Sequence, residues 1–221
     1  MTWVKICGMT NLEDALVAVD AGADAVGFVF YEKSPRCVTV ETAREIVKKL
    51  PAGVEKVGVF VNEVEATICD FVSRAGLTAI QMHGENEDPH IADLVVKRMP
   101  GVSVMAAVSM HHASPQGWAM MWHPDSVRAI LLDSGKSSKP GGTGEAFDWI
   151  AAVPVVDHIK TLFKVVAAGG LSPENVGEAI GILRPWGVDV VSGVETSPGK
   201  KDPEKVRAFV RAVRQMDRRA G

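Results

Sequence analysis

The sequence has few of the features that mark cross-linked, metal-binding or membrane-spanning proteins. Its 221 residues contain only three cysteines, Cys7, Cys37 and Cys69, and no Cys-x-x-Cys spacing. An odd count without that spacing argues against a disulfide framework and a zinc site, and it suits a reducing compartment such as the cytoplasm. No apolar run approaches the roughly 20 residues of a membrane span. No basic segment followed by a long apolar one indicates a signal peptide, so we expect no membrane partner.

The chain also lacks a marked excess of charge. It has 24 Lys and Arg against 27 Asp and Glu, a formal net charge of −3. This balance argues against a general nucleic-acid surface. An anionic small molecule would therefore need local positive potential from backbone amides and a few basic side chains. Hydrophobic residues make up 47% and charged residues 23% of the chain, which is typical of a globular protein.

Apolar runs alternate with helix-periodic segments along the whole chain, and several runs are nearly continuous, as in strands buried on both faces. The expected strands lie near 3–7, 24–30, 56–61, 78–82, 102–108, 128–132, 163–167 and 188–192. A faint internal repeat joins 21–26, 75–80 and 186–191, each ending a helix at Gly and entering a strand. We therefore predict a (β/α)8 barrel, as a single domain over residues 1–221. The stretch 109–127 has no helical pattern, so no regular fifth helix is expected there.

Cys7 ends the first apolar run, and Gly8 follows it. Thr10 and Glu13 have capping-box spacing, so a helix should begin directly after this turn. Cys7 should therefore lie at the carboxyl end of the first strand, which carries the chemistry in parallel α/β proteins. The alternative is a small buried core residue, the commoner role of a lone cysteine.

Three further polar residues follow expected strands. Asp133 ends the run 129–132 and is a candidate acid or base, or else a turn cap. Arg36 follows Pro35 and is suited to grip a carboxylate with two parallel bonds, or else lies on the surface. His83 ends the fourth strand and is a pocket or a structural residue. His111 and His112 have no ligand-spaced partners, so no metal site is expected.

Two glycine-containing turns follow the last two strands. Gly169 and Gly170 precede Ser172-Pro173, which has the composition of a helix start, and Ser192 and Gly193 begin the second turn. Exposed amides and a helix N-terminus can hold phosphate oxygens, and the loops after strands seven and eight are a frequent phosphate site in barrels. Each turn alone is weak evidence of a phosphate site.

A further loop, which contains Gly141–Gly144, could fold over a bound ligand.

Together these stretches resemble the phosphoribosylanthranilate isomerases of tryptophan biosynthesis. The resemblance covers most of the chain and fades over 109–127. Its motifs, in order, are KICGMT at 5–10, GFVF and SPR within 27–36, VGVFVN at 57–62, QMHGE at 81–85, LLDS at 131–134, GGTGEAFDW at 141–149, AGGLSPENV at 168–176 and SGVETSPGKKD at 192–202.

The resemblance implies a (β/α)8 barrel without a cofactor that rearranges N-(5-phosphoribosyl)anthranilate to 1-(2-carboxyphenylamino)-1-deoxyribulose 5-phosphate. It implies that Cys7 is the general base, that Asp133 is the general acid and that Arg36 contacts the anthranilate end. The two glycine turns would hold the phosphate, and His83 would line the pocket. The partner is then a phosphorylated small molecule, and the protein is a monomer or a homodimer.

Two alternatives remain open at this stage. One is the related isomerase of histidine biosynthesis or a bifunctional form, which shares the phosphate turns but uses a carboxylate where Cys7 stands. The other is a catalytically silent barrel that binds a phosphate ligand.

The proposed acid and base would also need suitable pKa values. Because cysteine titrates near 8.5 and aspartate near 3.9, each needs a pKa shifted toward neutrality, or it acts from a minor protonation state.

Overall fold

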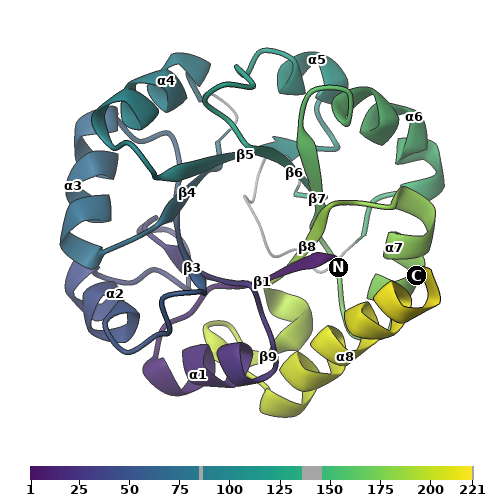
Figure 1. Ribbon diagram of the computed structural model, residues 1–221, viewed down its shortest axis with the longest axis horizontal. Helices are drawn as coiled ribbons and strands as arrows, with labels where there is room; N and C mark the ends of the chain where they lie inside the picture. The colour runs from purple at the N-terminus through teal and green to yellow at the C-terminus, as the bar shows by residue number, and fades with distance from the viewer. Residues whose placement is uncertain (85–86, 136–145, 221) are drawn as a thin grey trace.

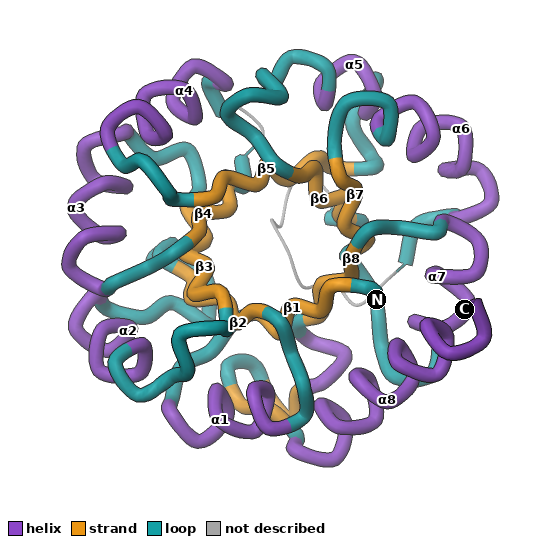
Figure 2. The backbone as a smooth tube through the Cα atoms, viewed as in Figure 1, coloured by secondary structure: helices purple, strands orange, loops and turns teal. Residues whose placement is uncertain are grey.

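The structure is a computed structural model that describes residues 1–84, 87–135 and 146–220. Eight parallel strands form one closed barrel, because β1 pairs with β8 as well as with β2 (Figure 2). This confirms the predicted (β/α)8 barrel. The strands are β1 (Trp3–Cys7), β2 (Ala25–Val29), β3 (Glu55–Phe60), β4 (Ala79–Met82), β5 (Ser103–Ser109), β6 (Ala129–Asp133), β7 (Lys164–Ala167) and β8 (Gly187–Val190).

Helices surround the barrel on all sides (Figure 1). They are α1 (Leu12–Asp20), α2 (Val40–Val47), α3 (Glu65–Ala75), α4 (Pro89–Arg98), α5 (Pro115–Ala119), α6 (Trp149–Ile159), α7 (Val176–Leu183) and α8 (Pro203–Ala220). The helix α5 has only five residues. The region 109–127 therefore does hold a fifth helix, which was not expected from the sequence because five residues are too few to show a helical period.

Two helix starts differ from the sequence expectation. Asn11, not Thr10, caps α1, because its side-chain oxygen accepts the Asp14 amide at 2.8 Å. The helix α7 begins only at Val176, after a turn, so Ser172-Pro173 does not form its start. A helix N-terminus therefore does not follow the glycine turn directly.

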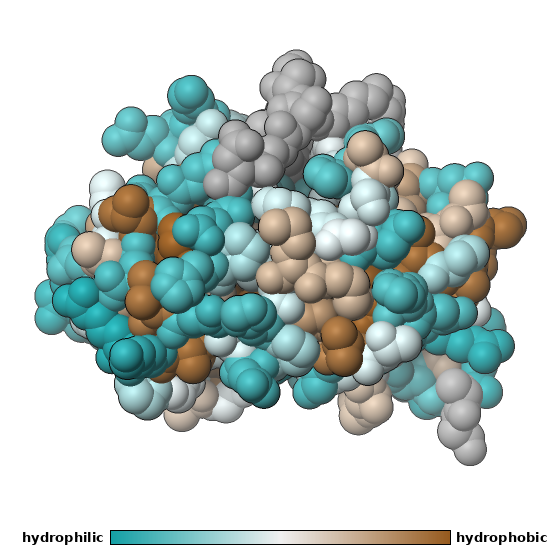
Figure 3. Space-filling view, turned by 90° about the horizontal axis from the view of Figure 1, so that it is seen from above, coloured by the Kyte–Doolittle hydropathy of each residue, from teal (hydrophilic) through white to brown (hydrophobic). Residues whose placement is uncertain are grey.

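The apolar core has two layers, one inside the barrel and one between the strands and the helices. The inner layer includes Ala25, Val57, Met105 and other strand residues that are almost fully buried. Their side chains fill the barrel, so it is a packed core and not a pore. On the outside, hydrophobic residues lie scattered among hydrophilic ones (Figure 3). In the described part of the chain, no helix is long and apolar enough to cross a membrane.

A small hairpin after β8 was not predicted. The 3-10 helix η1 (Ser192–Val194) leads into β9 (Glu195–Ser197), which pairs antiparallel with β10 (Lys200–Lys201). These strands have three and two residues and no apolar pattern, so the sequence carries no strand signal for them. The hairpin connects the end of β8 to α8 and lies beside the site described below.

Candidate active site

A pocket opens at the carboxyl ends of the barrel strands, and it contains the predicted site residues with one exception. Gly193 does not line it but packs behind its wall. The lining residues include Cys7, Arg36, Gln81, His83, Asp133, Gly169, Gly170, Asp189 and Ser192. The barrel topology explains this convergence, because the carboxyl ends of all parallel strands meet at one end of the barrel.

Cys7 is the last residue of β1, and its side chain is 4% exposed. It pairs in register with Gly27 of β2, and a Cβ atom at Gly27 would lie 2.5 Å from the Cys7 sulfur. Gly27 therefore leaves the space that the thiol occupies. Burial raises the pKa of Cys7, and the nearby Lys5 ammonium opposes this shift. The thiol thus has a pKa shifted away from neutrality, so base chemistry would proceed from a minor thiolate population.

Lys5 lies one pleat below Cys7 on the same strand and is fully buried. Its ammonium donates to Gln81 Oε1 at 2.8 Å and to Asp189 Oδ1 at 3.0 Å. Burial alone would lower the pKa of Lys5, but Asp189 and Cys7 raise it above its ordinary value. Burial raises the pKa of Asp189, and Lys5 opposes that shift. The floor of the pocket is therefore a buried ion pair next to the thiol.

Asp133 ends β6 and is 7% exposed. One of its oxygens lies 3.5 Å from Nε2 of His83, and the other accepts the Gly135 amide at 3.2 Å. His83 Nδ1 is in turn 3.2 Å from the Gln81 amide nitrogen. These contacts hold the carboxylate at the mouth of the barrel, as the sequence predicted, and they place His83 beside it.

The two glycine turns contact each other. Gly169 and Gly170 have φ angles of 73° and 66°, a left-handed conformation that favours glycine. A Cβ atom at Gly193 would lie 1.9 Å from the Leu171 carbonyl oxygen, so only glycine allows this approach. The amides of Gly170 and Gly193 donate to no acceptor among the described residues. The Gly170 amide is therefore available to an anion at the pocket wall, and the Gly193 amide lies next to the lining residue Ser192.

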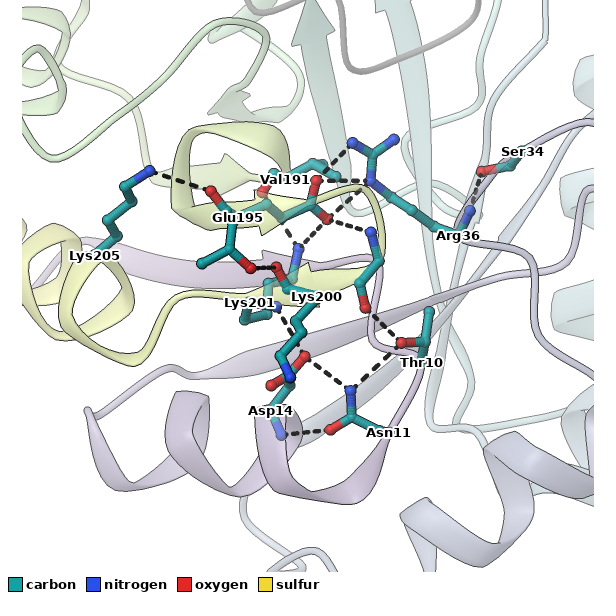
Figure 4. Close-up of polar contacts among 12 residues, drawn as sticks. Thr10, Asn11, Asp14, Ser34, Arg36, Val191, Glu195, Lys200, Lys201 and Lys205 are labelled. Carbon is teal, nitrogen blue, oxygen red and sulfur yellow. Dashed lines mark hydrogen bonds and ion pairs between the residues drawn. The ribbon is translucent and has the colours of Figure 1, made fainter.

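Arg36 lies in the wall of the pocket and is only 9% exposed. Its Nε and Nη2 atoms already bind the Glu195 carboxylate, at 2.9 and 2.7 Å (Figure 4). The alternative of a surface arginine is therefore wrong. The Nη1 atom makes no hydrogen bond within the described ranges.

Sequence reasoning missed Lys5, Asp189, Glu195 and Lys201. A charged residue inside an apolar run, as in the strand that contains Asp189, is a signal that could have found the first pair. Among the residues that the structure describes, no group of His, Cys, Asp and Glu is arranged to hold a metal ion. The loop Gly141–Gly144 lies outside the described residues.

A closed barrel with a thiol and a carboxylate at its strand ends, and open amide turns after its last two strands, is typical of barrel enzymes that act on small phosphorylated molecules. Residues 4–212 match the family model described as N-(5'-phosphoribosyl)anthranilate (PRA) isomerase, and the chain belongs to this family.

Similar proteins agree with this assignment. The N-(5'-phosphoribosyl)anthranilate isomerase of Geobacter sp. (strain M21) is 48% identical over 221 residues, covering 98% of this chain and 100% of the relative. The solved isomerase from Thermotoga maritima has a TM-score of 0.86 at 43% identity and covers 97% of this chain and 100% of its own. Another solved isomerase, at 41% identity and a TM-score of 0.81 over 97% of this chain and 100% of its own, is in complex with reduced 1-(o-carboxyphenylamino)-1-deoxyribulose 5-phosphate.

Proposed function

We propose that this chain catalyses the Amadori rearrangement of N-(5'-phosphoribosyl)anthranilate in tryptophan biosynthesis, with Cys7 as the general base and Asp133 as the general acid. The observation that carries the proposal is the single pocket that both side chains line, together with Arg36 and the glycine turns. Family membership supports the substrate. The solved relative that holds the reduced product analogue supports the same choice.

The reaction divides into two proton transfers. Asp133 protonates the ribose ring oxygen, the ring opens, and an iminium forms at C1. Cys7 then removes the proton from C2, which gives an enolamine that tautomerises to the ketose product. In that tautomerisation C1 takes the proton from the Cys7 thiol and the C2 hydroxyl gives its proton to the Asp133 carboxylate, so the acid and base return to their starting states. A positioned acid or base of this kind contributes typically 10²–10⁴-fold in rate.

The two ends of the substrate would be held by different parts of the pocket. The amides of Gly170 and Gly193, with Ser192, bind the phosphate. Arg36 binds the anthranilate carboxylate through its Nη1 side, because Glu195 occupies the Nε and Nη2 edge. His83 supports Asp133 from 3.5 Å. With both ends fixed, C1 and C2 lie between the acid and the base.

The test compares Cys7→Ser, Asp133→Asn and a matched control, Cys69→Ser. Cys69 is also a buried free cysteine, but it lies on α3 away from the pocket. We expect kcat to fall at least about 100-fold in the first two variants, since a hydroxyl is a poor base and an amide carries no acidic proton. The control should keep its rate. Near-normal turnover in Cys7→Ser would remove Cys7 from the mechanism.

We also propose that the chain acts in the cytoplasm and forms a homodimer. The three free cysteines support a reducing compartment. A solved relative at 42% identity is described as monomers generated from the dimeric isomerase of Thermotoga maritima, and it covers 97% of this chain and 100% of its own. Sedimentation equilibrium at micromolar concentration should give twice the chain mass of 23.6 kDa. A single-chain mass would contradict the dimer.

A further inference from the structure

We propose that Glu195 is a positioning residue for the substrate carboxylate: it fixes Arg36 with the Nη1 side toward the pocket and ties this arginine to the turn that holds the phosphate. The inference rests on the role proposed above for Arg36. It concerns a residue that does not itself line the pocket.

The pair between Glu195 and Arg36 is buried and joined by three hydrogen bonds. Glu195 Oε2 accepts from Nη2 at 2.7 Å and from Nε at 3.2 Å, and Oε1 accepts from Nε at 2.9 Å. Glu195 is 7% exposed and Arg36 is 9% exposed. Burial alone would raise the pKa of Glu195, but Arg36 and Lys201 hold it below its ordinary value. The carboxylate is therefore ionised at neutral pH, and its planar fork defines the plane of the guanidinium.

Glu195 also joins three loops at the mouth of the barrel. It lies on β9, directly after the turn η1 (Ser192–Val194). Its Oε1 atom accepts the Lys201 ammonium at 2.9 Å and the Gly199 amide at 3.2 Å, which closes the β9–β10 hairpin. The Gly199 carbonyl accepts the Thr10 hydroxyl at 2.5 Å, in the loop after β1 (Figure 4). The Glu195 carboxylate and the hairpin that it closes thus connect the loops that follow β1, β2 and β8.

The path of Arg36 explains why a fixed orientation matters. Its side chain runs across Gly8, where a Cβ atom would lie 2.7 Å from the Arg36 Cδ atom. The aliphatic stem of Arg36 therefore passes directly beside the turn that follows Cys7. If the Arg36 side chain rotated, its contact with the substrate carboxylate would move relative to the Cys7 thiol. Holding it in place before substrate arrives removes the loss of side-chain freedom that binding would otherwise require.

The experiment uses Glu195→Gln in the full-length protein, with steady-state kinetics. Glutamine keeps the size of the side chain but loses the charge and one acceptor, so Arg36 loses its bidentate partner. We expect KM to rise about 10-fold or more while kcat changes much less, because the lost interaction positions the substrate. A second substrate, in which aniline replaces anthranilate, has no carboxylate and should show little difference between Glu195→Gln and wild type.

The matched control is Glu55→Gln. Glu55 forms the same kind of bidentate pair, with Arg128 at 2.6 and 2.8 Å, at the other end of the barrel. The Glu55→Gln variant should leave KM unchanged. Glu195→Asp is the second variant in case Glu195→Gln does not fold, because it keeps a charge for Lys201 but shortens the reach to Arg36. It should also raise KM.

The decisive comparison is the double variant Arg36→Met with Glu195→Gln. If Glu195 acts through Arg36, the double variant has the KM of Arg36→Met alone. If the KM increases of the two single variants multiply in the double variant, Glu195 does not act through Arg36 and the positioning role is overturned. A KM in Glu195→Gln as small as that of the Glu55→Gln control would overturn it too. An unchanged KM in Arg36→Met alone would instead refute the carboxylate role proposed for Arg36, and the inference would fall with it, whereas the roles of Cys7 and Asp133 would stand.

Discussion

The buried ion pair between Lys5 and Asp189 leads to a quantitative prediction for Lys5→Met. The side chains of Lys5 and Asp189 are 0% and 5% exposed, and the substitution leaves the carboxylate and the Gln81 carbonyl oxygen without their shared donor. Breaking a buried pair by removing one partner costs about 3–5 kcal/mol. At about 2–4 °C per kcal/mol for a chain of this size, we expect Tm to fall by roughly 6–20 °C.

The assays are urea unfolding, which gives the free energy, and thermal unfolding, which gives Tm, both followed by circular dichroism at pH 7 with Lys48→Met as the control. Lys48 pairs with Glu45 on the surface, where the two side chains are 52% and 66% exposed. Such a solvent-exposed pair contributes little to stability, because water and salt screen it. The double variant Lys5→Met with Asp189→Asn should recover part of the loss, because no unpaired charge remains. A loss in Lys5→Met as small as that of the control would refute the reasoning.

The same pair should also make stability depend on alkaline pH. The pKa of Lys5 is raised in the folded protein. A group with a raised pKa contributes stability that is fully present below its unfolded value, about 10.4, and that is lost as the pH rises through the folded value. The difference in unfolding free energy between wild type and Lys5→Met should therefore stay constant near neutrality. It should narrow only above about pH 10.4, the unfolded pKa of lysine.

Three further outcomes follow from other parts of the structure. Gly193→Ala would place a Cβ atom 1.9 Å from the Leu171 carbonyl oxygen, so the glycine turns must separate and KM should rise at least about tenfold, a loss of ~1.4 kcal/mol in binding; an unchanged KM would contradict the phosphate site. Burial and a hydrogen bond to Glu65 raise the pKa of Cys69 to about 11. Iodoacetamide at pH 8 should therefore label the exposed Cys37 first, as read by peptide mass mapping, and early labelling of Cys69 would contradict this. Arg128→Met removes the bidentate pair with Glu55, so urea unfolding should show a loss of about 1–3 kcal/mol at unchanged kcat/KM.

Most of the fold could be predicted from the sequence because parallel strands buried on both faces appear as continuous apolar runs. All eight predicted strands exist, and their ends agree within one or two residues. The final helix begins at Pro203, directly after Asp202, which accepts the Glu204 amide at 2.9 Å; an Asp-Pro pair is a typical helix start. The hairpin β9–β10 was missed because its strands are too short to show a period. The start of α7 was missed because a turn separates Ser172-Pro173 from the helix.

The candidate site was predictable to the extent that strand ends define it. Cys7 and Asp133 end apolar runs, and a barrel brings such ends together. The partner of Arg36 was not predictable, because Glu195 is 159 positions away and the contact depends on how two loops fold onto each other. No periodic pattern encodes the contact between those loops. The extent of the domain over residues 1–221 stays a prediction. The roles of the site residues also stay predictions, which the variants described above test.

The ion pair on the pocket floor is an intermediate case, since the closed topology itself predicts it. Once the barrel is inferred, β1 must pair with β8, and the register places Lys5 directly opposite Asp189. Both residues are charged positions within otherwise apolar strands, where an unpaired charge would be very costly. Each therefore needs an opposite charge on a neighbouring strand. When the barrel closes, β1 and β8 become neighbours, so Lys5 and Asp189 become each other's partner. A sequence that places a lysine in its first strand and an aspartate in its last thus contains evidence of barrel closure, in addition to the evidence from the apolar runs.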